Sequence, residues 1–159
     1  MKKDKKKIAM EDIGKLDQKN RDMNNYNFEL RFYIKHKNKS LEFIQAKIPL
    51  PMTNGWSIGS ERKASNGKLL GGLRSETYWN HRIEVKNRRD FFNYAITFLI
   101  HLIKKYDLGD FFKELTSEHG EINLIINLID HNNIGDILTL QHMSILSEYN
   151  VNIGVEYFI

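Results

Sequence analysis

The sequence predicts a single α+β domain, and three features of the chain carry this prediction. Residues 26–34 alternate between apolar and polar side chains, which is typical of a strand with one buried face. Residues 87–106 form one long apolar segment of helical character, and shorter strand-like and helix-like segments alternate around it. The chain has 159 residues, of which 41% are hydrophobic and 28% are charged, so its length and composition fit one domain with its own core.

The first 24 residues are expected to form an arm outside this domain. They are rich in Lys, Asp and Asn and lack apolar periodicity, so they offer too little apolar surface to offset the entropy lost on ordering. We therefore assign residues 1–24 to a basic flexible arm and residues 25–159 to the domain. The alternating strand that opens the domain places one set of side chains on its buried face: Tyr26, Phe28, Leu30, Phe32 and Ile34.

A short helix is predicted after this strand. Ser40 is placed to cap a helix over residues 41–47. The helix cannot continue through Pro49 and Pro51, because proline lacks the backbone amide that helical hydrogen bonding needs.

A long polar region with several glycines, residues 52–75, comes next. We expect a strand near residues 56–62 and a hairpin around residues 65–73. The region contains neither of the glycine patterns of phosphate-binding loops, and no helix follows it to present backbone amides to a phosphate.

The next predicted elements are a strand and the long central helix. Residues 76–85 indicate a strand with Trp79 on its apolar side. Asn87 is placed to cap the helix over residues 87–106, and Asp90 adds negative charge where the helix dipole is positive. The helix is apolar around most of its circumference, which predicts a buried core element.

The C-terminal part adds further helices and strands. Asp110 is placed to cap a short helix that Gly120 closes, and Thr139 is placed to cap another. Residues 122–129 indicate an inner strand and residues 151–159 a final strand. The order β-α-β-β-α-β-α-β begins with a ferredoxin-like split β-α-β-β-α-β unit, which a C-terminal helix and strand extend. We expect an antiparallel or mixed sheet with helices mainly on one face.

The net charge of +4 is unevenly divided along the chain. Residues 25–105 carry fifteen basic and six acidic residues, whereas residues 106–159 carry one basic and nine acidic residues. The two halves can neutralise each other across shared edges of one fold, or they can present a basic and an acidic patch to a partner.

No pattern in the chain points to catalysis, a metal or a cofactor. The absence of cysteine excludes disulfides, thiolate zinc sites and a cysteine nucleophile, and it suits a reducing cytoplasm. No zinc-binding H-E-x-x-H and no nucleophile motif G-x-S-x-G is present, and polar residues interrupt every apolar segment before it reaches membrane-spanning length. We therefore expect a cytoplasmic, non-enzymatic protein without cofactor, metal or membrane partner. The histidines, which have no ligand-like spacing, are His36, His81, His101, His119, His131 and His142.

Binding of RNA or another nucleic acid is the main alternative function. Basic residues accompany two aromatic residues of exposed type, Tyr33 and Tyr78, and ferredoxin-like sheets bind RNA by stacking bases on strand aromatics. However, the signature run of RNA-binding domains of this kind is absent, and the near-neutral charge of residues 25–159 argues against a dedicated phosphate binder. Nucleic acid therefore ranks second among the expected partners, and a small enzyme ranks third among the functions.

Several segments carry a family resemblance: NFELRFYI, LEFIQAKIPLP, ETYWNHRIEV and LTLQHMSILSEYNVNIGVEYFI. Together with the glycine-bearing hairpin and the long helix, they make residues 26–159 similar to an uncharacterised bacterial family of small α/β domains of unknown function. Such families resemble, in their setting, the immunity proteins encoded near toxins. The resemblance implies a non-catalytic protein-binding module, in one form an immunity-like inhibitor of a bacterial toxin, and it brings no catalytic residues with it.

The expected contact surface centres on the glycine-bearing hairpin. Interface energy concentrates in Trp, Tyr and Arg, and a loop that does not serve the core is free to specialise for a partner. Trp79 is expected in the core instead, and a competing interpretation also packs Trp56 there. The residues that we expect to form or border the contact face are Trp56, Arg62, Arg74, Tyr78 and Arg82.

Overall fold

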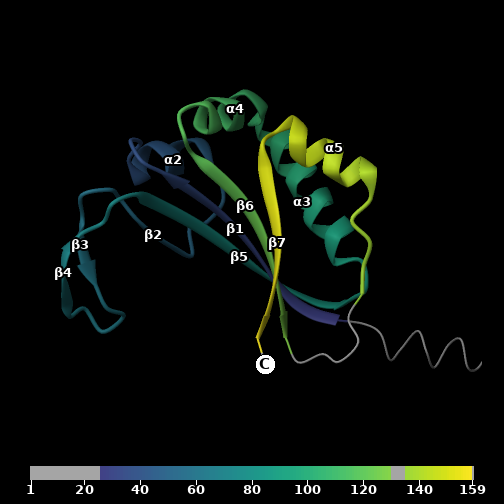
Figure 1. The fold of residues 1–159 in the computed structure, drawn as a ribbon, viewed down its shortest axis with the longest axis horizontal. Helices are drawn as coiled ribbons and strands as arrows, with labels where there is room; N and C mark the ends of the chain where they lie inside the picture. The colour runs from purple at the N-terminus through teal and green to yellow at the C-terminus, as the bar shows by residue number, and fades with distance from the viewer. Residues whose placement is uncertain (1–25, 130–134, 159) are drawn as a thin grey trace, which may run out of the picture.

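The computed structural model of the chain describes residues 26–129 and 135–158. The architecture is α+β, as predicted: five strands form one mixed sheet, and the four helices of the described residues lie on one side of it (Figure 1). A separate two-stranded hairpin projects from one end of the large sheet. Within the described ranges, no helix is both long enough and apolar enough to cross a membrane. The arm predicted for residues 1–24 lies outside the described residues.

The central strand of the large sheet is β1 (Tyr26–His36). It pairs antiparallel with β5 (Thr77–Arg88) on one side and with β6 (Glu121–Ile129) on the other. Beyond β5 lies the antiparallel β2 (Asn54–Trp56), and beyond β6 lies the parallel β7 (Val151–Phe158). The strand order is therefore β2-β5-β1-β6-β7.

The alternation of β1 separates the two faces of this sheet. Successive side chains of a strand point to opposite faces, so the even-numbered residues from Phe28 to His36 point toward the helices, and the odd-numbered residues from Glu29 to Lys35 point away. Trp79 on β5 pairs in register with Ile34 and is fully buried, which confirms its predicted place in the core. The helix-side residues of β1, each at most 2% exposed, are Phe28, Leu30, Phe32 and Ile34.

Two helix caps confirm the predictions. Ser40 Oγ accepts a backbone N–H from the first turn of α2 (Leu41–Lys47) at 3.2 Å. Thr139 Oγ1 accepts the backbone N–H of His142 at 3.2 Å at the start of α5 (Leu140–Glu148), and His142 Nδ1 in turn accepts the Thr139 N–H at 3.4 Å. Both helices therefore begin where a side-chain oxygen satisfies a free amide.

The central helix begins later than predicted. β5 continues through Arg88, and α3 (Phe91–Tyr106) follows it. Asn87, the predicted cap, lies near the end of β5 with a φ of 56°, a left-handed conformation that asparagine adopts more readily than most residues. The Asp136 carboxylate instead accepts the Phe92 N–H at 2.7 Å. The prediction was wrong because a cap supplied from 44 positions away leaves no local pattern.

The short helix α4 (Gly109–Ser117) differs from its prediction in detail. Asp110 lies inside its first turn rather than at the capping position. At the other end, His119 takes the left-handed conformation with a φ of 66°. Gly120 is needed for space instead, because a Cβ at that position would lie 2.6 Å from the carbonyl oxygen of Leu115.

The glycine-bearing region contains the expected hairpin but not the expected single strand. The strand predicted near residues 56–62 is divided between β2 and β3 (Glu61–Lys63). β3 pairs antiparallel with β4 (Leu69–Leu73) in a sheet of their own. Gly71 and Gly72 have φ values of 75° and 72°, so β4 contains two consecutive left-handed residues that only glycine adopts without strain.

Gln45 on α2 links this helix to the buried indole of the sheet. Its Oε1 accepts the Trp79 indole N–H at 2.7 Å. Its Nε2 donates to the carbonyls of Ile48 and Leu50 at 3.1 and 3.2 Å, so one side chain serves three polar groups. A buried tryptophan needs such a partner for its single donor.

We expect Gln45→Ala to lower the free energy of unfolding by about 1 to 3 kcal/mol, because it leaves the buried Trp79 N–H without an acceptor. Lys47→Ala, at an exposed position of the same helix, is the matched control and should change stability by less than about 0.5 kcal/mol. Urea unfolding followed by tryptophan fluorescence measures both. Equal losses in the two variants would show that the indole hydrogen bond contributes nothing.

Candidate functional site

The face of the large sheet that carries no helix is a polar surface that crosses all five strands; we call it the open face. The strand register places Asn54, Asn80, Tyr33, Asn123 and Asn152 in one row across it, from β2 to β7. Asn152 donates to Asn123 Oδ1 at 3.1 Å within this row. Four of the five strands therefore present an amide at the same level of the sheet.

An aromatic stack stands at the β2 end of the open face. Trp56 and Tyr78 are cross-strand neighbours whose rings are stacked, with centroids 4.5 Å apart and planes inclined by 24°. The Arg74 guanidinium lies over the Trp56 ring, 4.0 Å from its centroid, and the Tyr33 ring lies 5.5 Å from that of Tyr78. Burial raises the pKa of the Tyr78 phenol above its usual value. We call these four residues the aromatic stack.

Several cations of the open face are already paired with carboxylates. Each pair links two segments of the sheet, and the Arg31–Glu156 pair reaches across β6, so these cations are already neutralised by carboxylates of the same chain. The three pairs and their N–O distances are Arg31 with Glu156 at 2.9 Å, Lys35 with Glu76 at 3.4 Å, and Arg82 with Glu29 at 3.7 Å.

The division of charge along the sequence is partly cancelled by the fold. Arg31 from the basic half is bound to Glu156 from the acidic half. On the side of the helices, Lys39 lies 3.6 Å from Glu114 and 3.0 Å from Glu118. These contacts support the interpretation that the two halves neutralise each other across shared edges.

The β3–β4 hairpin adds exposed apolar side chains next to the aromatic stack. Leu69, Leu70 and Leu73 are each more than half exposed, and no helix of the described residues lies over them. A cluster of exposed leucines is a common mark of an interaction surface. A hollow of about 270 Å³ joins the hairpin to the stack, and its lining residues are Trp56, Arg62, Leu73, Arg74, Ser75 and Glu76.

The structure brings four of the five predicted contact residues together. Trp56, Arg74 and Tyr78 belong to one stack, and Arg62 lines the adjoining hollow. Arg82 lies farther along β5, exposed on the open face and paired with Glu29. Trp56 is half-buried on the open face rather than packed among the helix-side core residues.

Sequence reasoning missed the three leucines of the hairpin as contact candidates. A signal for them exists, because Leu69, Leu70 and Leu73 are apolar residues in a glycine-rich segment without any periodicity that could bury them. The asparagine row had no such signal, because its members are adjacent only through the strand register.

Some polar groups of the open face have no partner within the fold. Asn80 is fully buried, and neither of its amide atoms has a hydrogen-bond partner among the described residues. The same holds for Nδ2 of Asn123 and Oδ1 of Asn127, whose side chains are also buried. A buried polar group without a partner costs about 1 to 3 kcal/mol, so these amides lower the stability of the fold at this face.

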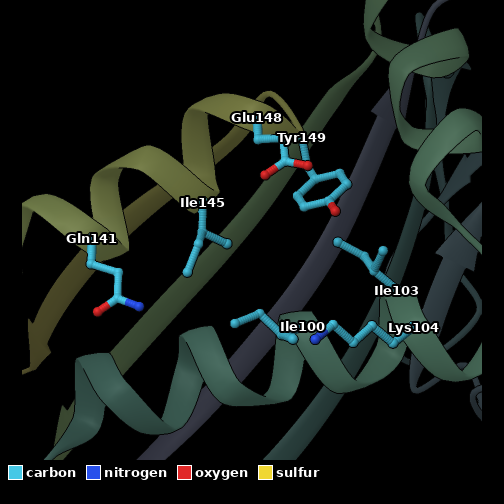
Figure 2. Close-up of a pocket in the computed structure, with 7 residues that line it drawn as sticks. All are labelled: Ile100, Ile103, Lys104, Gln141, Ile145, Glu148 and Tyr149. Carbon is cyan, nitrogen blue, oxygen red and sulfur yellow. The ribbon is translucent and has the colours of Figure 1, made fainter.

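A separate cavity of about 300 Å³ lies between α3 and α5. Its lining is mixed, with three isoleucines and four polar side chains. Figure 2 shows its lining residues, Ile100, Ile103 and Lys104 from α3 and Gln141, Ile145, Glu148 and Tyr149 from α5 and its end.

The histidines occupy unrelated structural positions. His36 is buried and its Nδ1 accepts two backbone N–H groups of the following turn at 3.0 Å each. His81 Nδ1 lies 2.7 Å from a proline carbonyl oxygen, and His142 belongs to a helix cap. His131 lies outside the described residues. Within the described part of the chain, no group of three or more His, Asp or Glu side chains could hold a metal ion.

No family model matches the chain, and no curated protein and no solved structure matches it either. The resemblance to a bacterial family of small domains therefore stays a prediction.

The fold should lose stability as the pH falls below about 6.5, and we expect His36 to cause part of this loss. Burial lowers the pKa of His36 in the folded state, and protonation of Nδ1 would break two hydrogen bonds. Because the unfolded chain then binds the proton more readily, the contribution to stability is present above the unfolded pKa and is lost as the pH falls through the folded value.

The His36→Asn variant tests this assignment, because its amide oxygen can accept in place of Nδ1 but does not titrate. Urea unfolding at about pH 8 and about pH 5.5 should show a smaller loss for the variant than for the natural protein. Parallel pH profiles of the two proteins would contradict the role of His36.

Proposed function

We propose that this protein is a non-catalytic protein-binding module whose contact surface is the aromatic stack together with the β3–β4 hairpin. The observation that carries the proposal is the packing of Trp56, Tyr78 and Arg74 against one another on a sheet face without helices. Trp, Tyr and Arg dominate the binding energy of protein interfaces. Side chains that already hold each other in place lose little rotamer freedom when a partner binds.

The form of this function suggested by the family resemblance is an immunity-like inhibitor of a bacterial toxin, acting in the cytoplasm. Such an inhibitor needs no chemistry of its own, because covering the partner's active surface is sufficient. The exposed leucines of the hairpin would supply apolar contact, and the stack would supply the central anchors.

The partner surface is expected to be acidic where it meets the hollow. Arg62 and Arg74 line this hollow and form no ion pair within the described residues. Arg31, Lys35 and Arg82 are already paired with carboxylates of the same chain, so they are less available to bind carboxylates of a partner. Unpaired cations at the rim of a contact steer an acidic partner and raise the association rate.

We also infer that the elements from β1 to β6 form a ferredoxin-like split unit, into which the β3–β4 hairpin is inserted. Two facts support this inference: the order β2-β5-β1-β6 and the antiparallel pairing of all three neighbouring strand pairs. α2 connects β1 to β2, and α3 and α4 connect β5 to β6, as the two crossovers of such a unit require.

Binding of RNA or another nucleic acid is the second candidate function, and the adjacency of Tyr33 and Tyr78 on a free sheet face favours it. Two observations count against it. Trp56 already stacks on Tyr78, and the nearby cations Arg31 and Lys35 are bound to carboxylates. A phosphate backbone needs cations that are free to replace its counterions.

We expect Trp56→Ala and Arg62→Glu each to weaken binding of the protein partner by at least about tenfold, or about 1.4 kcal/mol. Lys47→Glu, an equal charge reversal at an exposed position of α2, is the matched control and should leave affinity within about twofold. The partner is the protein recovered with the full chain in a pull-down, and calorimetry measures the affinity. Arg62→Glu should keep its thermal stability, since the side chain is exposed.

Unchanged binding by both variants would show that this face is not the contact surface. Attention would then move to the acidic end around Asp107 and Asp110. A titration with single-stranded RNA at low and high salt separates the second candidate: tight binding that falls steeply with salt would support the nucleic-acid function against the protein-binding one.

A further inference from the structure

β7 forms one edge of the large sheet, and its outer backbone has no strand partner among the residues that the structure describes. Its eight residues correspond to about 26 Å of unpaired edge. Folded proteins usually protect such an edge with proline, lysine, a bulge or a very short strand. Residues 151–158 contain no proline, lysine or arginine, and the β6–β7 register has no shift, whereas the strand at the other edge, β2, has only three residues.

The charge of β7 does not guard this edge either. Glu156 is its one charged residue, and the Arg31 guanidinium binds the Glu156 carboxylate at 2.9 Å on the open face. The charge is therefore neutralised within the same chain. In a symmetric pair of chains, each charge at the edge would face the same charge of the other copy. Because this edge has no unpaired charge, two copies can approach each other there without electrostatic repulsion.

Apolar side chains are exposed along the sheet part of this edge. Val155 and Tyr157 point to the side of the helices, as do their register partners Ile126 and Leu128 on β6. The partners on β6 are buried, whereas Val155 and Tyr157 are 45% and 46% exposed. The helices therefore do not fully cover the C-terminal half of β7.

The helix layer exposes apolar side chains at the same edge. α5 contacts both α3 and β7, and Leu146 is the one side chain of this helix that is buried. Gln141 lines the cavity on the α3 side (Figure 2). Met143 follows two residues later, about 200° around the helix, so it lies on the side of α5 that faces away from α3. Met143 is 44% exposed, and Leu140 on the outer surface of the helix is 82% exposed.

We propose that the β7 edge binds a second copy of this chain, with β7 antiparallel to its counterpart about a two-fold axis. The two sheets would then form one continuous sheet, and each α5 would lie beside the other. An extended peptide fits this edge less well, because a single added strand covers only the sheet layer and leaves Met143 and Leu140 in water. A second copy brings a sheet edge and a helix together, which matches an edge that is apolar in both layers.

This inference does not rest on the proposed function, because the β7 edge and the aromatic stack lie at opposite ends of the strand order. An edge of one strand and one helix is smaller than most obligate interfaces, so the dimer should dissociate on dilution. Sedimentation velocity of the full chain over about a hundredfold range of concentration should show the mass of one chain at the dilute end and of two at the concentrated end.

Val155→Lys should abolish the dimer by placing two like charges at the shared edge, and Met143→Lys should do the same from the helix layer. Leu70→Lys places the same charge on an exposed apolar residue of the hairpin and should leave the dimer intact. Circular dichroism checks that each variant is folded. Two disruptive variants in different layers keep the test decisive if one of them fails to fold.

The absence of cysteine allows a direct measurement of distance. A spin label on Val155→Cys should give an inter-chain distance no greater than about the 26 Å length of the strand, whereas a label on Leu70→Cys should give a much longer one. A natural protein that is monomeric throughout the range would overturn the proposal. A dimer that survives both lysine variants, or whose shortest label distance is at the hairpin, would overturn it as well.

Discussion

The alternation of apolar and polar side chains along β1 is the constraint on which the rest of this structure depends. β1 lies at the centre of the sheet, so both of its edges are paired and its side chains can point only to the two faces. Phe28, Leu30, Phe32 and Ile34 are buried on one face, and Glu29 and Arg31 occupy the other. A helix packed on the second face would have to bury charged groups, which is costly. All four helices of the described residues therefore share one face, and none of them covers the open face.

What the open face presents follows from strand register rather than from any local motif. The pairing of β2 with β5 brings Trp56 onto Tyr78, and the pairing of β5 with β1 brings Tyr33 beside them. Arg74 reaches the stack because the base of the hairpin is fixed: its N–H donates to the Ser60 carbonyl at 2.8 Å, and its carbonyl accepts the Gly59 N–H at 2.9 Å. Two backbone hydrogen bonds thus hold the guanidinium over the indole, and an apolar hairpin is held next to an aromatic anchor.

Local patterns in the sequence were sufficient to predict most helices and strands, but they were insufficient to predict how these elements pack and pair. The caps at Ser40 and Thr139 could be predicted because donor and acceptor lie within one turn of each other. The sequence could not show that Asn87 fails to cap α3, since the carboxylate that accepts an amide at the start of α3 comes from a distant segment. The contact candidates rest on residue type, on the division of charge and on nearness to the hairpin in the sequence, which group Arg82 with residues that the fold separates from it. Their arrangement depends on pairing between strands, which a single sequence does not show.

The open face also contains buried amides without hydrogen-bond partners, which lower the stability of the fold and which the packing of the core does not require. Four asparagines stand in one row, and Asn80 is buried there without a hydrogen-bond partner among the described residues. A β-branched apolar side chain at that position would suit the pleated sheet and remove the cost of the unpaired amide. The row lies on the side away from the helices, so no packing requirement of the core selects for asparagine. Proteins keep such unsatisfied groups mainly where they serve function, at the expense of stability. The least satisfied polar groups and the pre-arranged aromatic stack lie on the same face, which is why we propose this face, rather than the side of the helices, as the contact surface.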